Sequence, residues 1–248
     1  MTSVSHDVPD VPDAPEISHD HPDVTGGWLR PAVFGAMDGL VSNVALIAGV
    51  AGGTQHAGDT KAVVLAGIAG LVGGAFSMAT GEYVSVASQS EAAAREIDKE
   101  RREIIRNPAG ETAELAEMYV EKGLDPELAA EVARQIHADV DNAVSVHARE
   151  ELGVEPGELA SPRLAAVSSF LSFAAGALVP LVPYLLGSSS LLPTVLLTLV
   201  TLFVCGAVVA RVTVRPWWYG GIRQALLGGV SAGLTYAVGL LIGGVVGG

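Results

Sequence analysis

The sequence predicts an all-α membrane protein with five transmembrane helices and a three-helix soluble unit inserted between the second and the third. Half of the 248 residues are hydrophobic, and they gather in runs of about twenty, the length that crosses a bilayer. Of the 27 Asp and Glu residues, 16 lie between Glu91 and Glu151, and the net charge is −13. An acidic surface argues against nucleic-acid binding and is compatible with cations.

Residues 1–27 form an acidic tail that is rich in Asp, Pro and His and contains no Lys or Arg. The tail has no apolar periodicity, so we expect it to be disordered. It also lacks the basic start and apolar core of a signal peptide. His6, His19 and His21 lie among carboxylates, where they either collect divalent cations loosely or belong to a solvated tail.

Residues 28–90 contain the first two transmembrane helices, and the first of these runs from about Pro31 to Gly53. Asp38 lies about a third of the way along it. An ionisable group at that depth is costly and usually serves a function. The alternative is that Asp38 is paired with a helix end or with a neighbouring amide such as Asn43.

The second helix is the longest, because no Pro or Gly interrupts the chain between Gly81 and Asn107. We expect one helix from Lys61 to Arg106 that leaves the bilayer and continues into water. Met78 and Glu82 are four residues apart and share a face near its membrane end. Carboxylates with a thioether suit Fe²⁺, Mn²⁺, Co²⁺ or Zn²⁺ better than Ca²⁺ or Mg²⁺, although Met78 taken alone also fits as apolar filler.

Residues 91–155 form the predicted soluble unit, which begins with the charged end of the second helix. A stop signal at Asn107–Gly110 leads into a short helix that ends at Glu121. Asp125 and Pro126 then start a third helix that runs to about Leu152. The apolar residues of this unit suffice for only a thin core, so we expect it to need the membrane base, a second subunit or a bound metal.

Glutamates three residues apart occur twice in this unit and share a helix face each time. The turn between the helices folds the two pairs towards each other, and a His–Glu pair on the third helix completes a possible metal site. The candidate ligands are Glu100, Glu103, Glu111, Glu114, His147 and Glu151. The alternative is a solvated acidic face with partners such as Lys99 for Glu103. Against it, Glu96 and Glu100 form a like-charge pair that a nearby cation would relieve.

Residues 156–248 contain the last three predicted spans, at about Leu164–Leu186, Leu191–Arg211 and Gln224–Val246. Pro180 and Pro183 interrupt the first of these near its end. Because Cys205 is the single cysteine, disulfides are not part of the fold. Its place in an apolar run predicts a small core residue. Glycine pairs that permit close helix packing or a dimer contact recur at Gly35–Gly39, Gly49–Gly53, Gly70–Gly74, Gly229–Gly233 and Gly239–Gly243.

Basic residues set the expected orientation, because Lys and Arg favour cytoplasmic loops. They flank one side of every span, whereas the opposite side carries only Lys61. The tail and the soluble unit are therefore expected in the cytoplasm, and Gly248 outside or in a lumen.

Three segments of the chain resemble the vacuolar iron transporter family of plants, yeast and bacteria. They are FGAMDGLVSNVALIAGV in the first span, SMATGEYVSVASQSE in the second, and the acidic helices that follow. The resemblance covers about Trp28 to Gly248 and implies five membrane helices and a cytoplasmic three-helix metal-binding unit. It also implies a homodimer whose transport path lies at the subunit interface and exchanges Fe²⁺, sometimes Mn²⁺, for protons.

Residue by residue, the resemblance implies that Asp38 and Met78 line the path, with Glu82 of the GEY motif added to them. In the soluble unit it points to Glu100, Glu103, Glu111, Glu114 and Glu151 as ligands. Plant members carry Met near the position of His147, and the acidic tail is outside the family pattern. An imidazole at that position binds Fe²⁺, Zn²⁺ or Co²⁺ with an affinity that depends on pH near neutrality.

The sequence therefore predicts a proton-coupled Fe²⁺ or Mn²⁺ antiporter that moves metal out of the cytoplasm and contains no prosthetic group. The Ala-, Gly- and Val-rich composition suggests a prokaryotic plasma membrane, with a vacuolar membrane as the alternative. The rival interpretation is a membrane-anchored metal sensor that transports nothing. An enzyme is not expected, because no nucleophile–base set, phosphate loop or cofactor motif is present.

Overall fold

The computed structural model describes residues 27–54, 59–212 and 215–246, and within these ranges the chain is helical. The predicted tail, with His6, His19 and His21, lies outside the described residues except for Gly27. In chain order the elements are α1 (Leu29–Gly53), α2 (Thr60–Arg106), α3 (Pro108–Glu121), α4 (Pro126–Ile136), α5 (Val140–Glu151), α6 (Pro162–Leu178), the 3₁₀ turn η1 (Val179–Leu181), α7 (Val182–Leu185), α8 (Leu191–Val212) and α9 (Trp217–Val246).

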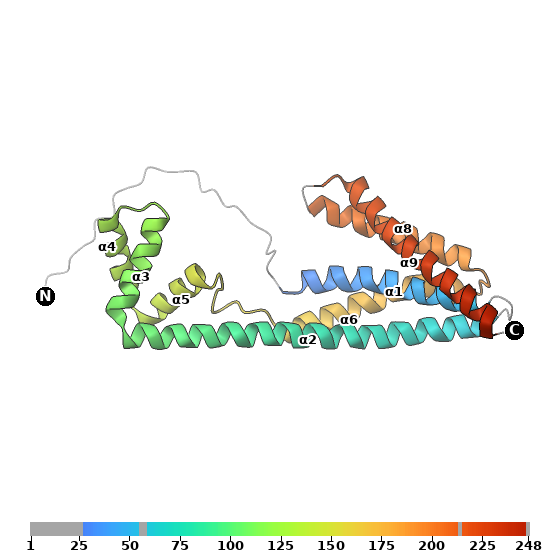
Figure 1. The fold of residues 1–248 in the computed structure, drawn as a ribbon, viewed down its shortest axis with the longest axis horizontal. Helices are drawn as coiled ribbons and strands as arrows, with labels where there is room; N and C mark the ends of the chain where they lie inside the picture. Colours follow the sequence, from blue (N-terminus) through green and yellow to red (C-terminus); the bar gives the residue numbers. More distant parts are fainter. Residues whose placement is uncertain (1–26, 55–58, 213–214, 247–248) are drawn as a thin grey trace.

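Five segments of the described chain are long and apolar enough to cross a membrane: α1, α2, α6 with its continuation to Leu185, α8 and α9. This confirms the predicted number of spans. α1, α6 and the apolar part of α2 lie side by side, and α8 and α9 pack against each other and against α1 (Figure 1). The expected interruption by Pro180 and Pro183 is present as η1 and the short α7.

α2 is the element that connects the two ends of the molecule. Its 47 residues span about 70 Å, whereas a bilayer core is about 30 Å thick. The charged part of the helix, Glu91–Arg106, is called the α2 extension below, and it carries α3, α4 and α5 at one end of the molecule (Figure 1). Asp59 starts the helix by accepting hydrogen bonds from the backbone of Lys61 and Ala62.

Glycines let the membrane helices approach backbone to backbone, as the repeated pairs predicted. A Cβ on Gly176 of α6 would overlap the carbonyl oxygen of Ala36 on α1. A Cβ on Gly239 of α9 would likewise overlap the carbonyl oxygen of Gly49 on α1. The pair that includes Gly239 therefore serves packing within one chain, while Gly233 has no neighbour within 4 Å of such a Cβ.

The predicted single helix from Asp125 to Leu152 is wrong, because the chain breaks into α4 and α5. The Asp139 carboxylate accepts hydrogen bonds from the backbone N–H groups of Asp141 (2.8 Å) and Asn142 (3.2 Å). These bonds satisfy the free donors at the start of a new helix, so the chain turns at residues 137–139 instead of continuing.

Two predicted helix starts also lie too late in the chain. α3 begins at Pro108 rather than Glu111, because Asn107 caps the helix and Pro suits its first turn. α9 begins at Trp217 rather than Gln224. Its first turns carry aromatic and basic side chains, which suit the membrane–water interface. The expected span began only after them, because they interrupt the apolar run.

Candidate metal site

A small apolar contact positions α5 against the α2 extension. Ile104 of α2 and Ala143 and Val144 of α5 form a buried cluster, which Ile97 and Ile136 cover. Glu100 lies one turn from Ile104 on α2, and His147 lies about one turn from Val144 on α5. The contact therefore brings Glu100 and His147 face to face.

Glu100, His147 and Glu151 are the predicted ligands that the structure brings closest together. Nδ1 of His147 lies 2.7 Å from Oε1 of Glu151 and 3.0 Å from Oε1 of Glu100. One ligand atom from each residue lies within 4.8 Å of the other two. Two ligands that hold one cation at about 2.1 Å and at right angles are about 3 Å apart, so this spacing suits a divalent transition metal.

Two members of this cluster, His147 and Glu100, have buried side chains. The His147 side chain is 0 % exposed and that of Glu100 is 10 % exposed. Burial, followed by the charge of Glu151, raises the pKa of Glu100 to about 7, while His147 opposes the shift. Near neutral pH the Glu100 carboxyl group therefore holds a proton part of the time, and a bound cation would displace that proton.

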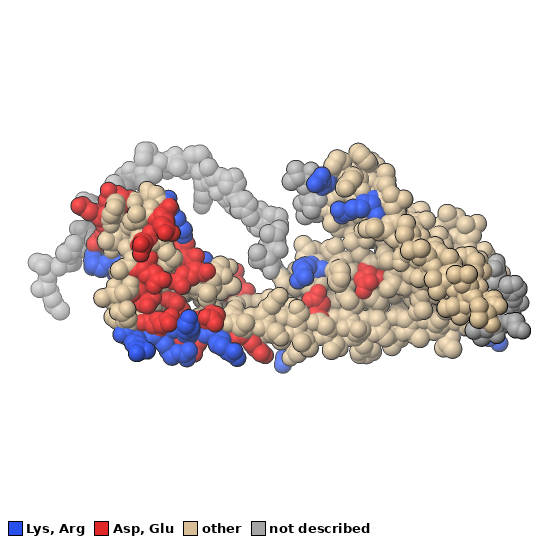
Figure 2. Space-filling model, in the orientation of Figure 1, with Lys and Arg blue, Asp and Glu red and all other residues tan. Residues whose placement is uncertain are grey.

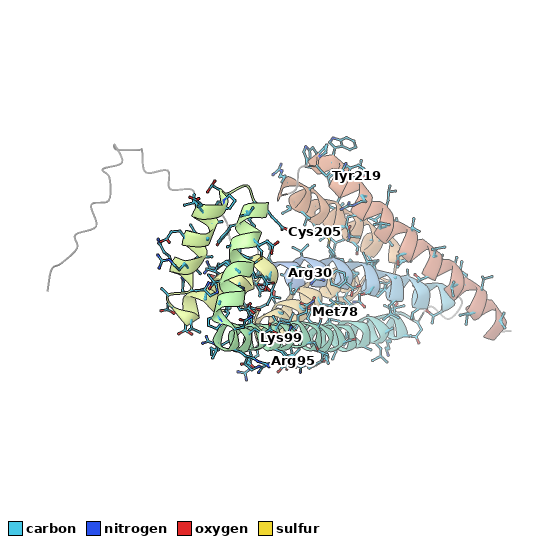
Figure 3. The ribbon with its side chains drawn as sticks, turned by 60° about the vertical axis from the view of Figure 1, so that its left-hand side comes forward. Arg30, Met78, Arg95, Lys99, Cys205 and Tyr219 are labelled. Atoms are coloured by element: carbon cyan, nitrogen blue, oxygen red, sulfur yellow. The ribbon has the colours of Figure 1, made fainter. Side chains whose placement is uncertain are left out.

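The other predicted ligands surround the cluster on α2 and α3. Partial burial, followed by the charge of Glu114, raises the pKa of Glu111, and Glu103 and Glu151 add to the shift. The predicted pairing of Lys99 with Glu103 is wrong, because Lys99 lies 3.9 Å from Glu96 instead. Acidic side chains gather over α3–α5, and basic side chains line the opposite side of the α2 extension, where Arg95 is labelled (Figures 2 and 3).

The predicted membrane residues Asp38, Met78 and Glu82 are not joined by any hydrogen bond or ion pair in the described part of the chain. Asp38 is half-buried on α1, and it does not pair with Asn43, whose side chain donates to the Ala177 carbonyl at 2.6 Å. Met78 packs against the cluster of Ala75, Phe173 and Ala177 beside α6 (Figure 3). The apolar role that the sequence left open for Met78 is therefore observed.

His137 lies beside the cluster, and the sequence analysis did not single it out. Its ring lies perpendicular to that of His147, with 5.1 Å between the ring centroids. In an unbroken helix, residues ten positions apart are separated by about 15 Å. The rings meet because the chain turns between α4 and α5, and the Asp139-Val140-Asp141-Asn142 sequence was the available signal for that turn.

The fold and this site define a multi-pass helical membrane protein with a candidate divalent-cation site at the water-exposed end of one of its membrane helices. The site combines two carboxylates with a buried imidazole, ligands that borderline transition metals prefer.

The chain matches the model of the VIT family over residues 29–240, and it belongs to that family. It is 37% identical to a vacuolar iron transporter of Acanthamoeba castellanii, over 88% of this chain and 79% of the relative. It is 30% identical to vacuolar iron transporter 1 of Oryza sativa subsp. japonica, over 89% of this chain and 88% of the relative. These relatives are named as transporters and not as enzymes, which confirms the expectation that the chain is not an enzyme.

Proposed function

We propose that the protein is a proton-coupled divalent-metal transporter that carries Fe²⁺ and, as a second substrate, Mn²⁺ out of the cytoplasm. The observation that carries this proposal is the cluster of Glu100 and Glu151 around the buried His147, at the end of a helix whose other half is long and apolar enough to cross a membrane. The relatives named vacuolar iron transporters support iron as the substrate.

In this proposal residues 91–155 form a cytoplasmic unit that captures metal, between membrane parts at residues 28–90 and 156–248. Glu100, His147 and Glu151 bind the cation first. Glu103, Glu111 and Glu114 lie within electrostatic reach and supply further carboxylates. Loss of the Glu100 proton on metal binding supplies a physical basis for exchanging metal against protons.

The membrane path consists of Asp38, Met78 and Glu82 at the interface of a homodimer. Asp38 and Glu82 are both half-buried, and no described residue forms a hydrogen bond or ion pair with either carboxylate. A carboxylate at membrane depth needs a cation, a proton, water or a partner chain. Large exposed side chains on α2, such as Leu65 (71 %) and Phe76 (61 %), give a second copy an apolar surface to cover.

We place the protein in a prokaryotic plasma membrane, where transport out of the cytoplasm makes it an exporter. A vacuolar membrane, as in the names of the relatives, is the alternative. The described Lys and Arg residues lie mainly towards the end of the molecule that carries α3–α5, which supports a cytoplasmic location for that end.

The second candidate function is a membrane-anchored metal sensor that moves no ions. It is favoured by the fact that the one compact ligand cluster found among the described residues includes none of Asp38, Met78 and Glu82. The two functions differ in whether the ionisable side chains of the membrane helices are required.

The deciding experiment measures Fe²⁺ uptake into proteoliposomes with and without an opposing proton gradient. We expect gradient-dependent uptake by the wild type and its loss in Asp38→Asn. Asp59→Asn is the matched control, because Asn also caps a helix and the carboxylate lies at the other end of the membrane helices. A wild type that binds Fe²⁺ yet transports neither Fe²⁺ nor Mn²⁺ would establish the sensor instead.

A further inference from the structure

The tautomer of His137 is fixed by its hydrogen bond to the backbone. Nδ1 lies 2.9 Å from the carbonyl oxygen of Ala133, and a carbonyl oxygen can only accept, so Nδ1 carries the proton. Nε2 of the neutral ring is therefore an unprotonated lone pair. This atom is buried, and it has no hydrogen-bond partner in the described part of the chain.

His147 has a similar arrangement. Its Nδ1 faces the oxygens of Glu100 and Glu151 at 3.0 and 2.7 Å, and its Nε2 is buried without a partner. The side chain is 0 % exposed. A buried polar atom that lacks a partner is costly, and two of them on neighbouring rings call for a shared explanation.

Each ring also makes, through Nδ1, the kind of hydrogen bond that orients metal-binding histidines. Such a histidine donates one ring N–H to a backbone carbonyl or a carboxylate, and this bond orients the other nitrogen towards the metal. Here the Ala133 carbonyl performs this role for His137, and the carboxylate of Glu151 performs it for His147.

The distance between the rings also fits a shared cation. Two imidazoles bound through one nitrogen each to a tetrahedral ion, at about 2.0–2.1 Å, have ring centroids about 5 Å apart. The observed separation of the His137 and His147 centroids is 5.1 Å.

We propose that Nε2 of His137 and Nε2 of His147 together form an imidazole site for a borderline divalent cation such as Zn²⁺, Co²⁺ or Fe²⁺. The site adjoins the carboxylate cluster, and the inference rests on the proposed metal-capture function of that cluster. A cation at Nε2 of His147 leaves Nδ1–H bonded to Glu151, so His147 binds either this cation or, through Nδ1, one held by the carboxylates. The unit therefore offers nitrogen ligands to borderline metals and oxygen ligands to harder Mn²⁺.

The test compares Zn²⁺ and Mn²⁺ binding to the full chain in detergent. His6, His19 and His21 are replaced by Asn in every sample, so that tail imidazoles do not contribute. His137→Asn is the decisive variant, because the shorter amide can still donate to the Ala133 carbonyl but supplies no Nε2. Glu131→Gln on the same helix is the matched control, since Glu131 pairs with Arg134 away from the cluster.

We expect His137→Asn to weaken Zn²⁺ binding about 10- to 100-fold and to leave Mn²⁺ binding within about twofold. X-ray absorption of the bound Zn²⁺ should count two imidazoles in the parent and one in the variant. Fewer than two imidazoles in the parent, or unchanged Zn²⁺ affinity in the variant, overturns the imidazole site and leaves the carboxylate cluster intact. Equal losses of Zn²⁺ and Mn²⁺ binding assign His137 a structural role and also overturn it. A parent that binds neither ion overturns the capture function as well.

Discussion

In the membrane part of the molecule, the carboxylates of Asp38 and Glu82 have no hydrogen-bond or ion-pair partner among the described residues. Where α5 packs on the α2 extension, by contrast, Glu100 of α2 and Glu151 of α5 both approach the buried His147. Both regions belong to α2 and the helices packed against it. Only at the α2 extension do carboxylates lie close to a side chain that can pair with them within the chain. In the proposed transport function, the partner of each membrane carboxylate comes from outside the chain, as a cation, a proton, water or a second subunit.

The sharpest test of this comparison removes one carboxylate of the cluster. Glu100→Gln keeps the shape of the side chain but loses the charge, so Mn²⁺ affinity should fall on the order of 100-fold, the equivalent of ~3 kcal/mol. Isothermal titration of the purified protein measures this fall. Asp38→Asn in the membrane part should leave the affinity of the extension unchanged, and an equal loss in both variants would break the distinction between the two regions.

The pH dependence of stability should also separate the two regions. Because the pKa of Glu100 is raised to about 7 in the folded protein, the folded state holds its proton more tightly than the unfolded state does. The free energy of unfolding of the metal-free protein should therefore fall as the pH rises from about 4.5 to about 7, by ~2–3 kcal/mol.

Thermal unfolding in detergent across this pH range measures the trend. Glu100→Gln should flatten it, and Mn²⁺ should reverse it, since the cation favours the ionised carboxylates. A slope that persists unchanged in Glu100→Gln would assign the effect to other acidic groups.

A substitution in the membrane part should lower stability and leave metal affinity unchanged. Gly176→Val places a side chain against the Ala36 carbonyl and forces α1 and α6 apart. We expect a loss of ~1–3 kcal/mol in stability, as for an overpacked core, seen as a lower melting temperature. Gly157→Val, at a site with nothing within 4 Å of an added Cβ, is the control. A change in Mn²⁺ affinity in Gly176→Val would show that the two regions are coupled more tightly than proposed.

The smallest expected effect concerns the ion pair between Arg101 of α2 and Asp141 of α5. A guanidinium nitrogen of Arg101 lies 2.6 Å from a carboxylate oxygen of Asp141. Both side chains are exposed, at 42 % and 80 %, so Asp141→Asn should change stability by less than ~1 kcal/mol. Ile104→Ala, which opens the buried contact, should cost ~2–4 kcal/mol. Chemical denaturation compares the two, and a larger loss from the ion pair would mean that charge rather than packing holds the cluster together.

The sequence predicted the membrane spans well because bilayer thickness sets the length of each apolar run. It predicted candidate ligands on α2 and α5 as residue types at helical spacing. It did not predict which of them meet, since that depends on the register between Ile104 and Val144, a contact between distant segments. The turn at Asp139 was missed because a run of helix-forming residues on both sides outweighed one capping signal, and His137 was missed with it.

The unbroken course of α2 has a mechanical consequence. From Glu82 to Arg106 the helix rises about 36 Å, and a helix of this kind acts as a stiff lever. A tilt of about 10° at the membrane boundary would carry its far end through about 6 Å, more than the ring separation at His137 and His147. Small changes of angle among the spans are therefore amplified where α3, α4 and α5 are attached.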